Sequence, residues 1–164
     1  MPLTSGDNPR TMNAELTHPL PTPDRPLPDA ALRMSQAGLV PFILGAALVW
    51  LVDERAHPYT TLALSAFAAL MVSFTGGILW GIGFVHPAAP PRLFVWGVVP
   101  SALAWVAVMM PASAGLVVDG VMLITCYLID RKVYPALGLS RWLNLRFRLS
   151  TIAALCCFLG AAGA

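Results

Sequence analysis

The chain alternates between long apolar runs and short polar segments. A membrane-spanning helix needs about 20 apolar residues, in a range of roughly 17–25, and five runs come close to this length or reach it. They are Met34–Val52, Thr60–Val85, Leu93–Met110, Gly115–Ile129 and Leu143–Gly160. The connecting segments are short, so neighbouring helices must pack as antiparallel hairpins. The pattern predicts an all-α, polytopic integral membrane protein with five transmembrane helices in one bundle.

Prolines and glycines interrupt several of these runs. Pro41, in the first run, cannot donate a hydrogen bond to the carbonyl of Ala37, which predicts a kink at that point. Pro100 lies inside the third run, and the pair Gly76-Gly77 lies inside the second. Such residues either allow close helix contact or break helices around a transport site, and the sequence leaves both interpretations open.

The second run contains small residues at every fourth position. They are Ser65, Ala69, Ser73, Gly77 and Gly81, and Gly76 adjoins the fourth of them. Small residues at this spacing let two membrane helices approach closely. We therefore expect this run to be the central packing helix, with the closest approach to a neighbour at Gly77.

Composition supports a membrane protein and argues against a soluble domain. The 164-residue chain is 57% hydrophobic and 11% charged, with a mean hydropathy of +0.72. Soluble domains contain about 25% charged residues. No basic surface with interleaved aromatic residues suggests a nucleic-acid partner.

Residues 1–33 differ from the remainder of the chain. The first 30 residues hold seven of the 15 prolines and show almost no apolar periodicity. This composition predicts a disordered, proline-rich tail before a transmembrane domain at 34–164. The tail has neither the apolar segment of a secretory signal nor the arginine-rich character of a transit peptide, so we expect a bacterial cytoplasmic (inner) membrane.

Basic residues gather on alternate connecting segments. Cytoplasmic loops are enriched in lysine and arginine, so this alternation predicts orientation. With five spans and the N-terminus inside, the outer side receives only Arg55. The cytoplasmic side receives Arg25, Arg33, Arg92, Arg131, Lys132, Arg141, Arg146 and Arg148. The predicted topology is therefore N-in and C-out.

Two acidic residues, one in the fourth run and one directly after it, are candidates for function, because charge inside a membrane is costly. Asp119 and Asp130 are 11 residues apart, or about 16 Å along a helix. In one interpretation both are helix-end carboxylates, since Asp119 suits the dipole of a helix N-terminus and Asp130 precedes Arg131 and Lys132. In the other, Asp119 is a polar partner, or a proton or cation contact, inside the bundle.

The aromatic and basic residues at the helix ends also have two interpretations. Arg146 and Arg148 lie in the first turns of the fifth run, where long arginine stems can extend to the lipid headgroups. Trp80 lies near the end of the second run and suits the interfacial aromatic belt. These residues either anchor the topology or hold anionic lipids.

No arrangement of residues predicts catalysis. There is no glycine-rich nucleotide motif, no phosphate-binding loop and no HExxH. Cys126, Cys156 and Cys157 lack metal-site spacing and are expected to be buried apolar residues. We therefore expect no enzyme activity, no metal and no cofactor.

Three segments carry a family resemblance: Met34–Leu51, Ser73–Gly81, and a third that comprises Asp130, Tyr134–Leu139, Trp142 and Leu145–Thr151. With them, residues 34–160 resemble the bacterial membrane proteins of domain-of-unknown-function family 3429, which also includes the mitochondrial transmembrane protein 69 of animals. The family pattern often has a polar residue before the tryptophan of the glycine segment, where this chain has Leu79. The resemblance implies a membrane-integral helical fold and no particular activity.

Taken together, these features favour a non-catalytic scaffold, assembly or accessory subunit that packs with other membrane helices. The alternative is a small-solute or ion transporter or channel, with a homo-oligomer left open. The expected partners are the lipid bilayer, other membrane proteins and anionic lipids, and not nucleic acid.

Overall fold

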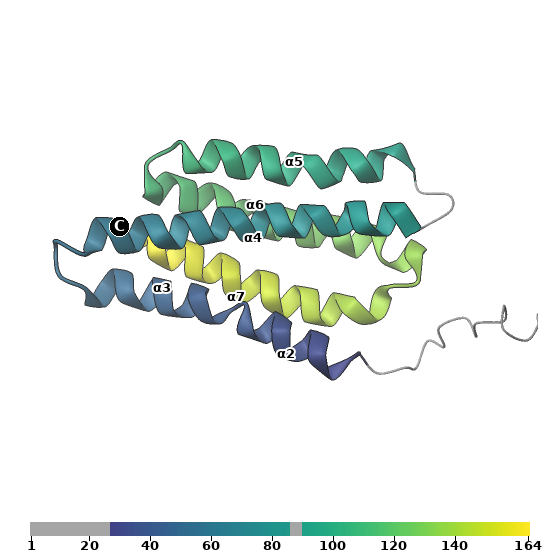
Figure 1. Ribbon diagram of the computed structural model, residues 1–164, viewed down its shortest axis with the longest axis horizontal. Helices are drawn as coiled ribbons and strands as arrows, with labels where there is room; N and C mark the ends of the chain where they lie inside the picture. The colour runs from purple at the N-terminus through teal and green to yellow at the C-terminus, as the bar shows by residue number, and fades with distance from the viewer. Residues whose placement is uncertain (1–26, 86–89) are drawn as a thin grey trace, which may run out of the picture.

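Every regular element is helical in residues 27–85 and 90–164, the parts of the chain that the computed structural model describes. The α-helices are α2 (Asp29–Ala37), α3 (Val40–Leu51), α4 (His57–Val85), α5 (Pro91–Val108), α6 (Ala112–Val133) and α7 (Leu143–Ala162). Two short 3₁₀ helices, η1 (Pro135–Leu137) and η2 (Ser140–Trp142), connect α6 to α7. Five stretches are long and apolar enough to cross a membrane, with α2 and α3 together forming the first. They run side by side in one bundle, and the C-terminus lies at the end opposite α2 (Figure 1).

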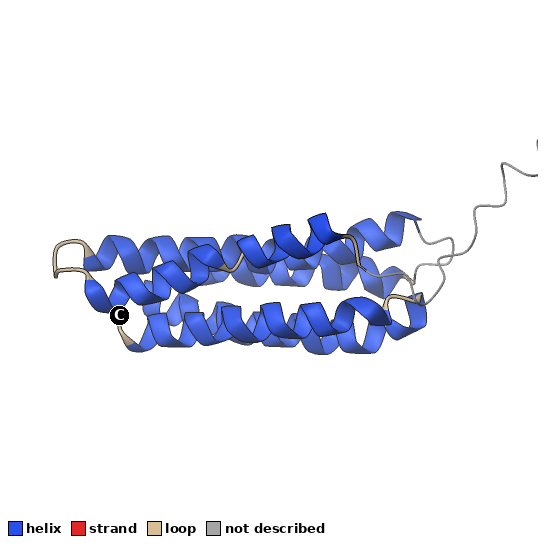
Figure 2. Cartoon of the chain, turned by 90° about the horizontal axis from the view of Figure 1, so that it is seen from below, coloured by secondary structure: helices blue, strands red, loops and turns tan. Residues whose placement is uncertain are grey.

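Pro41 divides the first span as its position predicts. α2 ends at Ala37, and α3 begins at Val40 with the proline in its first turn, where a missing N–H costs little. Between them the amide of Leu39 donates to the carbonyl of Gln36 at 3.0 Å, a tighter turn than an α-helix makes. Figure 2 shows this interruption within the first span. Pro100, in contrast, lies within a continuous α5.

The first helix begins before Met34, the expected start of the first span. α2 starts at Asp29, so residues 29–33 of the expected tail are helical. These residues carry no continuous apolar run, which is why hydropathy placed the boundary at Met34. Residues 1–26, the main part of the expected tail, lie outside the described residues.

α4 is the central helix, as the sequence predicts. It contacts α3, α5, α6 and α7, and therefore every other span. Its buried side chains, such as Leu64, Ala68 and Val72, belong to the main hydrophobic core, which includes residues from all five spans. Such contact on several sides explains why apolar residues surround α4 without one polar face.

The first and last spans meet at the C-terminal end of the bundle. The indole Nε1 of Trp50 donates a hydrogen bond to the carbonyl of Leu159 at 3.2 Å. The ring Nε2 of His57 lies 2.7 Å from the carbonyl oxygen of Gly163. These contacts attach the end of α7 to α3 and to the start of α4.

The stripe of small residues on α4 divides into a packed half and an exposed half. Ser65 and Ala69 are buried, and the hydroxyls of Ser73 and Ser101 are 2.8 Å apart across α4 and α5. Gly77 and Gly81 are exposed, and no atom lies within 4 Å of a Cβ built on either. Each four-residue step turns the position by about 40°, so the stripe rotates by roughly 160° from Ser65 to Gly81. The expectation that Gly77 marks the closest approach, and that Gly81 continues the packed stripe, is wrong.

The close helix contact that the sequence predicts at Gly77 occurs at Gly76 instead. A Cβ at Gly76 would lie 2.7 Å from the carbonyl oxygen of Gly97 and 3.2 Å from Pro100. A Cβ at Gly97 would in turn collide with the indole of Trp80. The Nε1 of this indole donates to the carbonyl of Phe94 at 2.8 Å, so Trp80 attaches α4 to α5. The backbones of these two helices meet at Gly76 and Gly97.

We predict that Gly76→Leu destabilises the bundle and that Gly77→Leu does not. The first change forces a side chain against the backbone of α5, which typically costs about 1–3 kcal/mol as overpacking. The second places a side chain in open space. Unfolding of both variants in detergent measures the difference, and equal stability of the two would contradict this packing.

Candidate functional site

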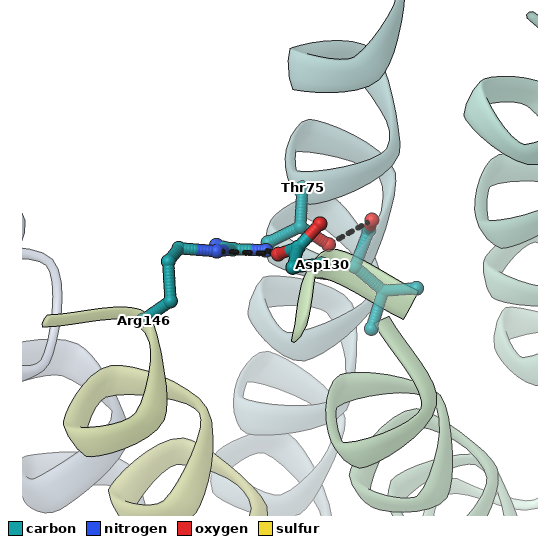
Figure 3. Close-up of polar contacts among 4 residues, drawn as sticks. Thr75, Asp130 and Arg146 are labelled. Atoms are coloured by element: carbon teal, nitrogen blue, oxygen red, sulfur yellow. Dashed lines mark hydrogen bonds and ion pairs between the residues drawn. The ribbon is translucent and has the colours of Figure 1, made fainter. Parts of the chain in front are cut away.

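A buried ion pair joins the ends of α6 and α7. Asp130 lies in the last turn of α6 and is 2% exposed, and Arg146 lies in the first turn of α7 and is 9% exposed. The Nε of Arg146 donates to Oδ2 of Asp130 at 2.7 Å, and Nη2 lies 2.5 Å from the same oxygen (Figure 3). The pair links the two helices inside the bundle.

The connection between α6 and α7 brings these residues together. Gly138 adopts the left-handed conformation, with φ of 68°, which glycine tolerates at no steric cost. Asp130 and Arg146 each lie eight residues from this glycine, one before it and one after it. Two residues at equal distances from the turn of a helical hairpin lie at the same height along the two helices. This equal spacing was the signal in the sequence for the contact.

Two further polar side chains surround the pair. Tyr134, which follows α6, is 3% exposed, and burial, together with the negative charge of Asp130, raises its pKa to about 12. Its phenol is therefore a hydrogen-bond donor at physiological pH. The side chain of Thr75, on α4, lies beside the carboxylate, and its hydroxyl donates to the carbonyl of Val72 at 2.8 Å (Figure 3). The sequence did not predict that either residue lies beside the ion pair.

These contacts correct the expectations for Arg146 and Asp130. Arg146 does not extend to the headgroups, because its guanidinium turns inward to a carboxylate that would otherwise be buried without a partner. Asp130 is not a solvated helix-end carboxylate, although it precedes Arg131 and Lys132 in the last turn. Arg148, two residues further on, is exposed.

Asp119 lies in the interior of α6 and is fully buried. Both of its carboxylate oxygens lack a hydrogen-bond partner. The interpretation as an exposed helix-end carboxylate is therefore wrong, because Asp119 follows two full turns of helix and faces the core. It does not contact the Asp130–Arg146 pair, so the two acids of α6 form separate features.

One cysteine adjoins Thr75 and Asp130, because Cys126 borders the same small cavity as these two residues. Cys126, Cys156 and Cys157 are buried free thiols. In the two described ranges, no three residues among histidine, cysteine, aspartate and glutamate come close enough to hold a metal ion. The candidate site is thus the cluster of Thr75, Asp130, Tyr134 and Arg146, which we call the polar cluster.

Comparison with known proteins identifies relatives. The model of the family described as "Protein of unknown function (DUF3429)" matches residues 27–162. Transmembrane protein 69 of Xenopus tropicalis is 30% identical over 144 residues, which cover 82% of this chain and 54% of the relative. The chain thus spans about half the length of this relative. No solved structure matches.

We predict that breaking the ion pair destabilises the bundle strongly. Arg146→Leu leaves the Asp130 carboxylate buried without compensation, which costs about 3–5 kcal/mol, whereas the double variant Asp130→Leu with Arg146→Leu should recover most of this loss. Arg148→Leu, at an exposed position, is the matched control. The free energy of unfolding in detergent measures each variant, and equal effects of the two arginine substitutions would contradict a structural pair.

Proposed function

This chain belongs to the DUF3429 family, and we propose that it is a non-catalytic accessory protein that packs against other membrane helices. One observation carries the proposal, namely the exposed half of the small-residue stripe. Gly77 and Gly81 form a GxxxG pair, and this type of pair allows close packing of two membrane helices. The chain does not use this pair for its own packing.

The surface around the two glycines suits a second helix. The backbone of α4 is open there, because no atom lies within 4 Å of either missing Cβ. Phe74 and Phe84, which are 65% and 71% exposed, flank the glycines on the helix surface. A second helix that docked on the glycines would contact the backbone of α4 closely. It would lie between the two large aromatic side chains.

The alternative of a transporter or channel has less support. Pro100 and the Gly76-Gly77 pair lie in continuous helices and do not break them around a site. Ser73 pairs with Ser101, and Asp119 lines neither of the two described cavities. The polar residues that transport would require instead make internal contacts or lie in packed core.

We expect the protein in a bacterial cytoplasmic membrane with its N-terminus inside and its C-terminus outside. The bundle end formed by the α6–α7 connection carries exposed basic residues, whereas the opposite end carries Arg55 beside Asp53 and Glu54. Cytoplasmic segments favour such basic residues.

A reporter that is active only in the cytoplasm tests this orientation. It should be active when fused at Leu139, in the connection between α6 and α7, and silent when fused at the C-terminus. An active reporter at the C-terminus would reverse the proposed orientation.

Photo-crosslinking in native membranes tests the docking of a second helix. A photoreactive residue in place of Phe84 should give a discrete protein adduct, and Gly77→Leu or Gly81→Leu should remove most of it by preventing close approach. Ala102→Leu, at an exposed position of α5, is the control and should leave the adduct unchanged. Adducts with lipid alone, or a protein adduct insensitive to both glycine substitutions, would contradict the proposal.

A further inference from the structure

A second feature of the bundle lies beside the glycine surface, and Phe74 borders both. A cavity of about 610 Å³ lies between the first span, α4 and α7. This volume is in the range of small-molecule sites, roughly 300–1,000 Å³. Its walls are mainly apolar and include Phe42 from α3, Met71 from α4 and Leu149 from α7.

One end of the cavity is polar because the polar cluster reaches it. Arg146, Tyr134 and Thr75 all line the cavity. A guanidinium has five N–H donors, and Arg146 directs its hydrogen bond to a single carboxylate oxygen of Asp130. Nη2 lies 2.5 Å from the same oxygen, outside hydrogen-bonding geometry, so Nε and Nη2 both face one atom of Asp130. The polar end therefore offers N–H donors beyond the two that face Asp130, on a side chain that is about nine-tenths buried.

The cavity opens sideways to the surface of the bundle. Met34 of α2 and Phe74 of α4 line it and are 71% and 65% exposed. Both residues belong to membrane spans, so the surface that they reach is covered by lipid. A ligand can thus enter from the bilayer and keep part of its structure outside.

The charge around this end favours an anion. Arg33, Arg131, Lys132 and Arg148 are exposed at this end of the bundle, and Asp29 is an exposed acid at the start of α2. The internal pair of Asp130 and Arg146 contributes no net charge. Basic groups beside a pocket between membrane helices attract anionic lipid headgroups.

We propose that this cavity binds one anionic phospholipid, with the phosphate at Arg146 and one acyl chain along α7. The apolar wall continues from Arg146 to Ala153, seven residues or about 10 Å along the helix. This length accommodates the upper part of an acyl chain. The remainder of this acyl chain and the whole of the second acyl chain pass out of the cavity through the opening between α2 and α4.

Lipid binding to the purified full-length chain in mild detergent tests the proposal. Native mass spectrometry and thermal unfolding are compared for phosphatidylglycerol and phosphatidylcholine with the same acyl chains. Leu149→Trp, at a partly buried wall position, fills the cavity without touching the ion pair. Leu155→Trp, at a 56% exposed position of the same helix outside the cavity, is the matched control. Ile78→Trp fills the cavity from α4 and repeats the test if the first variant does not fold.

We expect one retained phosphatidylglycerol per chain, and a higher melting temperature, for the wild type and for Leu155→Trp. Affinity should fall at least about tenfold in the two cavity-filling variants. Equal affinity of Leu149→Trp and Leu155→Trp for phosphatidylglycerol would overturn the proposal, as would equal binding of phosphatidylcholine. Displacement of the lipid by inorganic phosphate at the same concentration would also overturn it, because the acyl chain would then contribute nothing.

Discussion

The buried contact between Asp130 and Arg146 is the constraint on which the architecture of this bundle most depends. A charge without a partner is expensive inside a membrane protein, so each of these residues requires the other. Their pairing fixes the level at which α6 and α7 meet, and the left-handed Gly138 allows the chain to reverse at the required distance. The same pairing holds the guanidinium at the polar end of the lateral cavity.

The second constraint is the mismatch between a four-residue spacing and a helix of 3.6 residues per turn. A stripe at this spacing cannot remain on the contact face of a nearly straight helix over four steps. On α4 the early members of the stripe, such as Ser65, are buried in the bundle, and the last two glycines emerge on its surface. One pattern therefore supplies both an internal contact face and an unused one.

The sequence predicted the five spans from hydropathy, the first break from Pro41 and the central role of α4 from its small residues, because each of these features follows from a single segment. Which side of α4 faces its neighbours at the glycine pair was not predictable in this way. Gly76 and Gly77 are equivalent as glycines, and only the position of Gly97 on a different helix decides which one is buried. The ion pair also required knowledge of the turn, since Asp130 and Arg146 lie in different apolar runs. Their equal distance from Gly138 contained that information.

The two acids of α6 show how the same residue type takes different roles in one interior. Asp130 lies against a guanidinium and forms a pair without net charge. Asp119 is fully buried with neither oxygen bonded, so the cost of removing its carboxyl group from water is not offset by a hydrogen bond. Pairing with Arg146 thus keeps net charge out of the interior at Asp130, whereas Asp119 is held among core side chains without a partner. The exposed charges then lie at the ends of the bundle, and those at the end with the α6–α7 connection are mainly basic, which is the charge that the proposed anionic lipid requires.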